Sequence, residues 1–479
     1  MKVAVIGAGS IGFTRGIVRD ILCVPEFGET EFAFTDINER NLDMVYRLCK
    51  RDIEASGLPA KLTATLDRRA ALAGANYVFV VVRVAGLEGF RQDIEIPLKY
   101  GVDQCVGDTL GPGGIMYAQR TIPVLLEFCK DIAEVSAPGC LLINHSNPMA
   151  MNMWAVNARG GVPAVGLCHG VQHGHEQIAK AFGLPREEVD IICAGINHQT
   201  WYISVKHKGE DLTPRVLEAF EKDEGLMKSE KVRIDMMRRF GYYSTESNGH
   251  LSEYLPWYRK RQDDILNWVD LSYWAGGETG GYLRVCIEGR NWFETEFPEW
   301  MKAPAWTFRP EDRGTEHGSY IIEALETGRV YRGHFNVVNR GCITNLPADA
   351  IVEVPGYVDR NGISIPRVGD LPAGCAAVCN ASISVQRLAV QAALTGDDML
   401  LRQAMMMDPL TGAVCNPPEI WQMADEMLIA QAQWLPQYER AVADAKRRWA
   451  AGNLIPPKEF KGVARLPVRT PEELRAARG

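Results

Sequence analysis

The sequence lacks the patterns that direct a chain to nucleic acid or to a membrane. It has no lysine- and arginine-rich run beyond short pieces such as Lys446-Arg447-Arg448, and its formal net charge is −8. This acidic balance argues against nucleic acid and anionic membranes as the main partner. The N-terminal segment MKVAVIGAGS reaches a glycine before any long apolar run, so neither a signal peptide nor a transmembrane helix is expected there. We therefore expect a cytoplasmic protein that acts on a small molecule.

Paired cysteine motifs are also missing. The twelve cysteines of the 479-residue chain are scattered without a CxxC pair, which in a reducing compartment predicts free thiols rather than a disulfide framework. At least one thiol is then available for chemistry. The chain is too long for one hydrophobic core, because a single core stops growing at about 250–300 residues. We expect two lobes, residues 1–195 and residues 196–479.

Short apolar strands alternate with helical stretches in the first lobe, which is typical of a Rossmann-like α/β fold with a doubly wound parallel sheet. The expected strands cover residues 2–6, 31–35, 77–84, 140–143 and 164–167, and the expected helices include residues 14–22, 38–56 and 120–135. After about residue 195 the segments become longer and more helical. Residues 350–354 favour a strand, residues 378–383 stay ambiguous, and residues 385–450 favour helices. The second lobe is therefore predicted to be a mixed α+β domain.

The first strand runs directly into a glycine-rich turn that predicts NAD binding. Gly7 permits the tight turn, Gly9 lets the backbone approach a pyrophosphate, and Gly12, which follows Ile11, allows close helix packing. Asp36 ends the second strand, 24 residues after Gly12, where it would accept hydrogen bonds from a ribose diol and repel a 2′-phosphate. NAD is therefore favoured over NADP. The alternative is an ordinary glycine-rich turn, with Asp36 as the N-terminal acid of the next helix.

Polar clusters follow the later strands of the first lobe, at the sheet edge where α/β proteins place their ligands. Cys168 follows one apolar strand, and His198 follows another short apolar run. If both side chains lie above the same edge, a thiolate and an imidazole share one divalent metal, and substrate oxygens fill its open positions. The alternative is that both are ordinary core residues, as a lone cysteine or histidine usually is.

Seven stretches of sequence, in this order along the chain, together resemble one known family. They are GAGSIGF, GDTLGPGGIMYAQRTIP, SNPMAMNMWA, VGLCHGV, CAGINH, GYYSTESNGHLSEYLPWY and NRGCITNLPADAIVEVPGYVDRNGI. The combination resembles the NAD- and manganese-dependent glycoside hydrolases of family 4, and most of all the melibiase-type α-galactosidases. The match runs from residue 1 to about residue 435.

The resemblance implies an enzyme that cleaves glycosides by oxidation and elimination. In that reaction NAD⁺ takes hydride from C3 of the sugar, a base removes the C2 hydrogen, the C1–O bond breaks, water adds, and NADH restores the C3 alcohol. Mn²⁺ or another divalent metal, bound to the C2 and C3 oxygens, acts as a Lewis acid. The resemblance also implies a homodimer or homotetramer that binds a small carbohydrate.

The resemblance also implies roles for individual residues. Cys168 and His198 match the family's metal ligands. Asn147 matches an asparagine that contacts sugar and cofactor, and Asn197 lies beside the metal, where we expect it to bind substrate. His169 follows the metal cysteine, at the place where some α-specific members carry their general acid, and a histidine suits proton donation near neutrality.

Two further roles stay open between candidates. Asp108 is a second candidate acid or a substrate clamp, or else it caps a turn in its glycine-rich loop. We expect His250 to be the C2 base, with Tyr254 as the second candidate, because a tyrosine with a pKa of about 10 needs help from a metal or a cation. Either residue could instead pack in the core or stack on the sugar.

The sequence leaves the identity of the sugar open. Melibiase-type members usually carry Cys-His-Ser where this chain has Cys168-His169-Gly170, and uronidase relatives carry Cys-His-Gly. Arg340 also departs from the melibiase pattern, and it either pairs with a C6 carboxylate or is a structural or interface arginine. We expect an α-galactosidase, with α-glucosidase, α-galacturonidase or α-glucuronidase activity as alternatives. Rivals from other classes are a lactate- or malate-type NAD dehydrogenase and a non-catalytic sensor of NAD or sugar.

Overall fold

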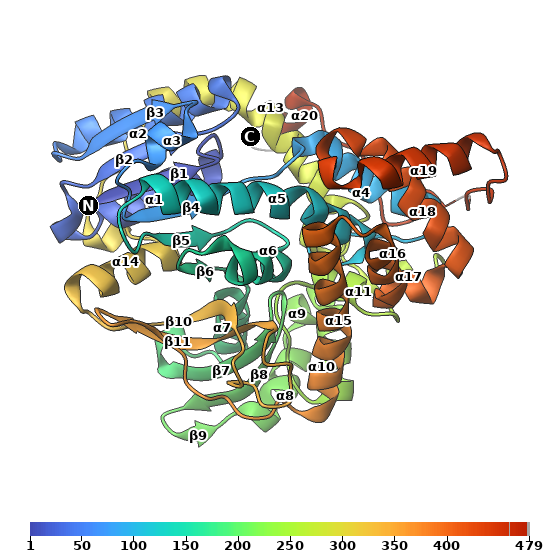
Figure 1. The fold of residues 1–479 in the computed structure, drawn as a ribbon. Coiled ribbons are helices and arrows are strands. Elements are labelled where there is room, and N and C mark those ends of the chain that lie inside the picture. Colours follow the sequence, from blue (N-terminus) through green and yellow to red (C-terminus); the bar gives the residue numbers. More distant parts are fainter. Residues whose placement is uncertain (459, 477–479) are drawn as a thin grey trace.

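A mixed sheet joins the two halves of the chain (Figure 1). The computed structural model describes residues 1–458 and 460–476, apart from the side chains of residues 290–295. In this part of the chain the strand order is β3-β2-β1-β4-β5-β6-β10-β11-β7-β8-β9, and β12 pairs with β11. The strands are β1 (Lys2–Ile6), β2 (Glu31–Thr35), β3 (Lys61–Thr65), β4 (Tyr77–Val80), β5 (Leu141–Asn144), β6 (Ala164–Gly166), β7 (Val189–Ile196), β8 (Gln199–His207), β9 (Glu210–Asp211), β10 (Tyr331–Val338), β11 (Ile351–Asp359) and β12 (Gly362–Ser364).

The six strands from β3 to β6 pair in parallel, which confirms the predicted Rossmann-like sheet. Successive side chains of β1 lie in two different core clusters, because they alternate between the two faces of the sheet. Since both faces are buried, the strand is apolar along nearly its whole length. The helices here are α1 (Ile11–Leu22), α2 (Glu39–Ser56), α3 (Arg68–Leu72), α4 (Gly86–Lys99), α5 (Gly111–Val135), α6 (Met149–Ala155) and α7 (Gly170–Ala181). One face packs on α1 and α2, and the other packs on α3 and α5.

Helix α5 begins nine residues before its predicted start at Arg120. The preceding stretch, Gly111-Pro112-Gly113-Gly114, looks like a loop in sequence but forms the first turn of the helix. A Cβ on Gly114 would lie 2.5 Å from the carbonyl carbon of Thr109, so only glycine lets the loop pack against this turn. The glycines therefore hold the polar loop that ends at Thr109 directly on the end of α5.

The sheet continues with antiparallel strands. In this part of the chain sequence analysis predicted a strand only at residues 350–354, and β11 begins at Ile351. Strand β10 pairs with β6 and β11, and β11 pairs with β7, the first strand of the β7–β8 hairpin. The mixed α+β character of the second half is confirmed. The division into residues 1–195 and 196–479 stays a prediction, and its boundary falls at the last residue of β7.

Helices form most of the rest of the described chain. They are α8 (Val216–Glu221), α9 (Glu224–Ser229), α10 (Lys231–Phe240), α11 (Asn248–Tyr254), α12 (Ile265–Trp268), α13 (Gly281–Lys302), α14 (His317–Thr327), α15 (Ala373–Thr395), α16 (Asp398–Met407), α17 (Pro409–Val414), α18 (Pro417–Ala430), α19 (Glu439–Ala450) and α20 (Pro471–Ala476). Shorter 3₁₀ turns cover Pro25–Phe27, Arg186–Glu188, Thr213–Arg215, Trp274–Gly276, Pro310–Asp312, Ala432–Trp434 and Pro436–Tyr438, and a π turn covers Val156–Gly160. The ambiguous residues 378–383 lie within α15, whose buried Cys375, Cys379 and Ile383 recur at helical spacing.

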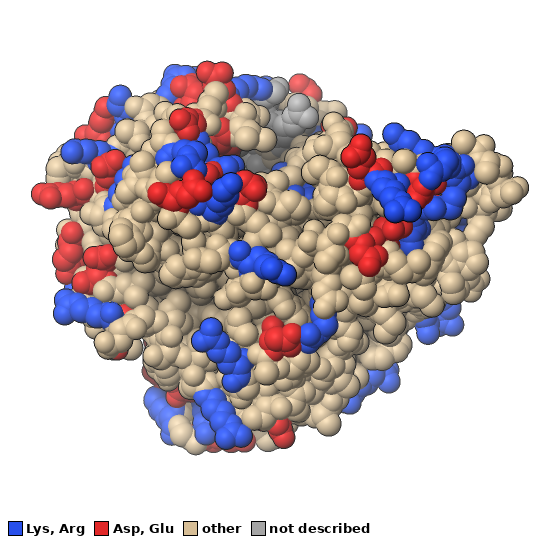
Figure 2. Space-filling view, in the orientation of Figure 1, with Lys and Arg blue, Asp and Glu red and all other residues tan. Residues whose placement is uncertain are grey.

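The largest core cluster lies where α15 packs against α5 and α6, and it joins the two halves of the chain. The face in Figure 2 carries acidic and basic side chains side by side. Across the described residues, every helix is too short or too polar to span a membrane.

Candidate active site

The glycine-rich turn joins the carboxyl end of β1 to α1. Gly7 has a φ of 85°, and a Cβ there would lie 2.2 Å from the carbonyl oxygen of Val81. A left-handed backbone and a close neighbour together exclude a side chain at this position. The Gly9 amide donates a hydrogen bond to Asp36 Oδ2 (2.8 Å), so the turn is held against the end of β2.

The amino end of α1 faces this turn without a capping side chain. The helix begins at Ile11, its first turn holds no acidic residue, and Ser10 makes no side-chain capping bond. Free amides and the positive end of the helix dipole suit a phosphate group. A Cβ on Gly12 would meet no described atom within 4 Å, so Gly12 borders open space and its predicted packing role is wrong. The residues predicted to bind NAD lie together here: Gly7, Gly9, Ile11, Gly12 and Asp36.

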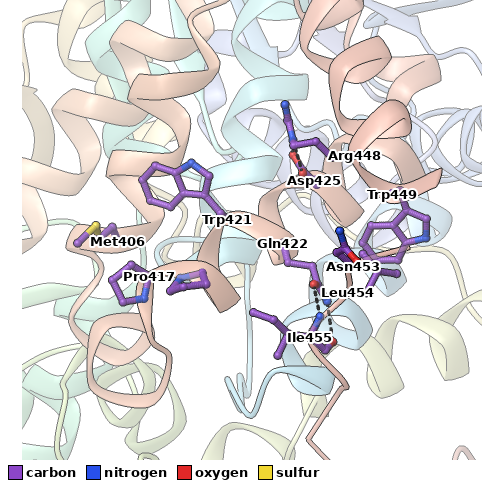
Figure 3. Close-up of a pocket in the computed structure, with 11 residues that line it drawn as sticks. Met406, Pro417, Trp421, Gln422, Asp425, Arg448, Trp449, Asn453, Leu454 and Ile455 are labelled. Atoms are coloured by element: carbon purple, nitrogen blue, oxygen red, sulfur yellow. Dashed lines mark hydrogen bonds and ion pairs between the residues drawn. The ribbon is translucent and has the colours of Figure 1, made fainter. Parts of the chain in front are cut away.

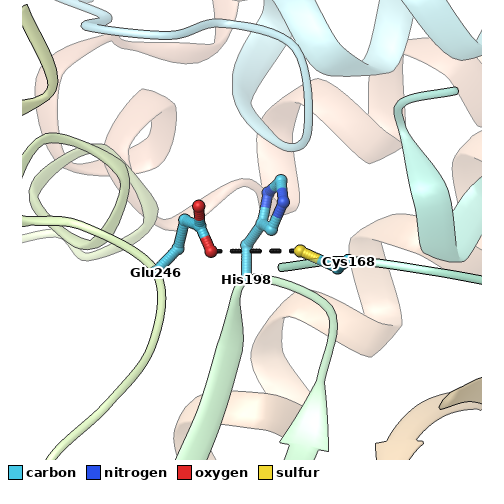
Figure 4. Close-up of side chains that lie close together, drawn as sticks. All are labelled: Cys168, His198 and Glu246. Atoms are coloured by element: carbon cyan, nitrogen blue, oxygen red, sulfur yellow. Dashed lines mark hydrogen bonds between the residues drawn. The ribbon is translucent and has the colours of Figure 1, made fainter. Parts of the chain in front are cut away.

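A cysteine, a histidine and a glutamate converge from three separate segments (Figure 4). Cys168 lies two residues beyond β6, His198 lies in the turn of the β7–β8 hairpin with a φ of 63°, and Glu246 lies between α10 and α11. One ligand atom from each, with all three within 4.8 Å of one another, could hold a metal ion. The Cys168 thiol lies 3.9 Å from Glu246 Oε2, and it accepts a hydrogen bond from the Gly170 amide (3.4 Å).

The electrostatics of this cluster favour a cation. Burial, together with the negative charges of Glu246 and Glu353, raises the pKa of the Cys168 thiol well above its usual value. Burial also raises the pKa of Glu353 to about 8. A thiolate and two carboxylates repel one another in a buried place, and a divalent cation would relieve that repulsion. Sulfur, nitrogen and oxygen donors together suit a divalent transition metal, so the residues present fit such an ion.

Asp108 and Asn147 meet beside this cluster. Asp108 is buried, and its Oδ2 accepts a hydrogen bond from Asn147 Nδ2 (3.1 Å) and lies 3.6 Å from the Arg83 guanidinium. Its Oδ1 accepts a hydrogen bond from the Thr109 hydroxyl (2.9 Å). Because both carboxylate oxygens face donors, the arrangement favours an ionised clamp over a proton donor at Asp108.

His169 forms a pair with a glutamate that sequence reasoning missed. His169 lies at the N-cap of α7, with its side chain 44% exposed, and its Nε2 is 2.9 Å from Glu316 Oε2. Burial lowers the pKa of His169, but the hydrogen bond and charge of Glu316 outweigh it, so the net pKa is raised. Glu316 is the N-cap of α14, where its other oxygen accepts a hydrogen bond from the Gly318 amide (3.2 Å). The carboxylate therefore orients the imidazole and stabilises its protonated form.

His250 and Tyr254, one turn apart on α11, both reach His198. The rings of His250 and His198 lie 4.9 Å apart, and His250 Nδ1 is 2.6 Å from the Ser247 hydroxyl. Burial, then the neighbouring His198, lowers the pKa of His250 well below its usual value. The Tyr254 hydroxyl lies 3.4 Å from His198 Nδ1, and burial raises the pKa of Tyr254 well above its usual value. A neutral imidazole accepts a proton at neutral pH whereas a neutral phenol does not, which favours His250 as the base.

Two family profiles match this chain. The profile of family 4 glycosyl hydrolases matches residues 2–184, and the profile of that family's C-terminal domain matches residues 193–411. The chain belongs to glycoside hydrolase family 4. The resemblance found in the sequence is thereby confirmed, and so is the class of enzyme, a glycosidase.

Individual relatives in family 4 cover nearly the whole chain. An alpha-galactosidase of Rhizobium meliloti is 57% identical over 476 residues, which is 99% of this chain and 97% of that protein. An alpha-galactosidase of Bacillus subtilis is 34% identical and covers 91% of this chain and 100% of its own length. Among solved structures, the 6-phospho-beta glucosidase of Thermotoga maritima with NAD and glucose-6-phosphate superposes with a TM-score of 0.74 at 25% identity, over 91% of this chain and 99% of that one.

The two remaining predicted substrate residues differ in their surroundings. Asn197, beside His198, donates from Nδ2 to Glu353 Oε2 (3.1 Å), and its buried Oδ1 has no hydrogen-bond partner among the described residues. That free acceptor suits a sugar hydroxyl. Arg340 is exposed in the turn between β10 and β11, and across the described residues no hydrogen bond or ion pair joins its side chain to the cluster. The structure therefore brings Asn197 to the site but gives Arg340 no visible place in it.

Sequence reasoning singled out Asp108 but missed three other carboxylates of this site, those of Glu246, Glu316 and Glu353. Glu246 stands within the quoted stretch GYYSTESNGH, only four residues before His250, and that spacing is the signal that could have found it. Glu316 and Glu353 come from α14 and β11, distant in sequence from Cys168. Only the folded chain brings these two to the site.

A separate hollow lies among the C-terminal helices (Figure 3). This cavity of about 660 Å³ is lined by Trp421 of α18, Trp449 of α19 and the ion pair of Arg448 with Asp425 (2.7 Å). None of its lining residues belongs to the cluster around Cys168.

Proposed function

We propose that the chain is an α-galactosidase that requires NAD and a divalent metal, with Mn²⁺ as the first candidate. The observation that carries this proposal is the convergence of Cys168, His198 and Glu246 within 4.8 Å of one another. The alpha-galactosidase of Rhizobium meliloti, 57% identical to this chain, supports the choice of sugar. Solved relatives named as complexes with NAD and manganese support the choice of cofactors.

Separate groups of residues would bind NAD and the metal. The glycine turn and Asp36 would hold NAD, and Cys168, His198 and Glu246 would hold the metal. When bound, NAD would exchange a hydride with C3 of the sugar, and the metal would polarise the C2 and C3 oxygens. Asp108 accepts from Asn147, so the pair is preset to orient a hydroxyl group between cofactor and metal.

Two histidines would move the protons. His250 accepts the C2 proton, since burial keeps its imidazole neutral, and Tyr254 is the second candidate for this step. His169 donates a proton to the leaving oxygen at C1, and Glu316 orients its imidazole for that transfer. Water then enters on the side that the leaving group vacates.

We propose α-galactosides over the alternatives within family 4. Alpha-galacturonidase and alpha-glucosidase relatives are only 27% and 26% identical to this chain. Arg340 is exposed, and among the described residues its side chain makes no contact with the cluster, so it offers no partner there for a C6 carboxylate. The cytoplasm would keep the Cys168 thiol reduced, and we propose a homodimer or homotetramer there.

Hydrolysis assays with matched substrates test this function. Nitrophenyl α-galactoside, α-glucoside and α-galacturonide are each supplied with and without NAD⁺, Mn²⁺ and a thiol reductant, after bound NAD has been stripped. We expect the α-galactoside to be hydrolysed fastest, and only with both cofactors present. Full activity without cofactors, or in Cys168→Ala, would refute the proposal. Net formation of NADH in proportion to the substrate consumed would instead indicate a dehydrogenase.

A further inference from the structure

A buried threonine lies between the metal cluster and Asp108. Thr109, 2% exposed, ends the polar loop before α5. Its hydroxyl oxygen lies 2.9 Å from Asp108 Oδ1 and 2.9 Å from His198 Nδ1. Sequence reasoning gave this residue no role.

The chemistry of the three groups fixes the direction of both hydrogen bonds. A hydroxyl group has one proton to donate and lone pairs to accept with, whereas an ionised carboxylate only accepts. The Thr109 proton therefore goes to Asp108, and the Thr109 oxygen accepts from a protonated His198 Nδ1. In the neutral ring this leaves Nε2 as the nitrogen with a free lone pair.

We propose that Thr109 is a positioning residue of the metal site, which holds His198 in the tautomer with Nδ1 protonated and Nε2 free to bind the metal. The proposal rests on the proposed function, because it needs a metal at Cys168, His198 and Glu246. An outer hydrogen bond of this kind fixes the orientation and the basicity of a metal-binding histidine. The Tyr254 hydroxyl, 3.4 Å from the same nitrogen, is the weaker acceptor by distance.

The same hydrogen bonds link the metal cluster to the residue expected to contact sugar and cofactor. Asp108 Oδ1 accepts a hydrogen bond from the Thr109 hydroxyl, and Oδ2 accepts one from Asn147 Nδ2. The Arg83 guanidinium, 3.6 Å from Oδ2, balances the negative charge of the carboxylate. His198 has its backbone fixed by the hairpin turn, so the ring's rotation is what remains to be set. Thr109 therefore aligns the metal ligand with Asn147 through a single carboxylate.

Mn²⁺ binding to the NAD-loaded, metal-stripped protein without substrate tests this role. Thr109→Val keeps the shape of the side chain and removes the hydroxyl, and we expect it to weaken Mn²⁺ binding by about 10- to 100-fold. Thr109→Ser keeps the hydroxyl and should retain wild-type affinity. Thr121→Val is the matched control, because the buried Thr121 hydroxyl of α5 has no partner among the described residues. Free Mn²⁺ is measured by electron paramagnetic resonance.

The possible results separate this role from simple packing. T109V that binds Mn²⁺ as tightly as T109S and T121V would overturn the role of Thr109. If T109V loses its native circular dichroism, Thr109→Ala removes the same hydroxyl and is compared with T109S instead. Raising the Mn²⁺ concentration should restore turnover of T109V, which a misfolded site would not allow. A wild-type protein that binds no Mn²⁺ would overturn the proposed metal site itself.

Discussion

At the scale of single residues, the site depends on carboxylates that act on histidines. Glu316 Oε2 lies 2.9 Å from His169 Nε2. The Thr109 hydroxyl donates a hydrogen bond to Asp108 and contacts His198 Nδ1, so it connects this carboxylate to the imidazole. Cys168, His169 and His198 could be singled out from their neighbours in sequence, since each stands in a short polar motif after a strand. His250, on α11, was found through the family resemblance alone. Glu316 and Thr109 could not be assigned in this way, because their roles depend on contacts with residues 147 and 89 positions away.

Glu316→Gln should reduce activity in a way that depends on the leaving group. The amide no longer stabilises a protonated His169, so an alkyl or sugar aglycone that needs the proton should lose about 100-fold in kcat/KM. A nitrophenyl aglycone leaves without protonation and should keep nearly its full rate. Steady-state kinetics on a nitrophenyl galactoside and a galactosyl disaccharide measure the difference.

The control for this prediction is Glu323→Gln on the same helix. Glu323 pairs with Arg329 (2.6 Å) and makes no contact with His169 among the described residues, so both substrates should be affected equally. Equal losses on both substrates in E316Q would show that Glu316 has only a structural role.

At the scale of elements, the glycine turn before α1 contains one glycine expected to matter for stability and another expected to matter for NAD binding. The motif predicted this element because strand, turn and helix are adjacent in sequence, so local conformational preferences suffice. The pairing of the β7–β8 hairpin, which carries His198, with β11 escaped prediction, since β11 lies more than 150 residues further on. Antiparallel pairing over that distance leaves no local signal.

Gly7→Ala and Gly12→Ala should change two different properties, the stability of the fold and the affinity for NAD. Alanine at position 7 meets the Val81 carbonyl in a left-handed backbone and should lower the free energy of unfolding by about 1–3 kcal/mol. Alanine at position 12 meets no described atom, so stability should be retained while NAD binding weakens, because the side chain enters the space expected for the pyrophosphate. Urea unfolding without NAD and NAD titration by fluorescence separate the two effects.

A G12A variant that binds NAD like the wild type would contradict this account of the turn. A G7A variant with unchanged stability would show that the backbone at position 7 adapts.

At the scale of the whole molecule, buried histidines couple stability to pH. Burial, then the nearby His317, lowers the pKa of His334 on β10 to about 3. The unfolded chain gains a proton on this residue below about pH 6.5, whereas the folded chain does not. The contribution of His334 to stability is therefore complete above that pH, and it is lost progressively as the pH drops toward 3.

His334→Gln should remove this part of the acid sensitivity. Between pH 8 and pH 5 the wild type should lose about 2 kcal/mol more of its free energy of unfolding than the variant. Urea unfolding of both proteins at each pH measures the difference, which is independent of any uniform cost of the substitution. Parallel pH profiles would mean that His334 titrates normally.

The large-scale organisation of the molecule explains why one reaction needs so long a chain. The parallel half of the sheet carries the glycine turn and Cys168, and the antiparallel half carries His198, so the proposed metal site exists only when both halves meet. Solvent exchange at C2 of the sugar tests this joint chemistry most directly. A nitrophenyl α-galactoside is hydrolysed in D₂O with NAD⁺ and Mn²⁺, and the galactose is analysed by nuclear magnetic resonance. We predict deuterium at C2 of the product. Galactose released without deuterium at C2 would contradict cleavage by oxidation and elimination.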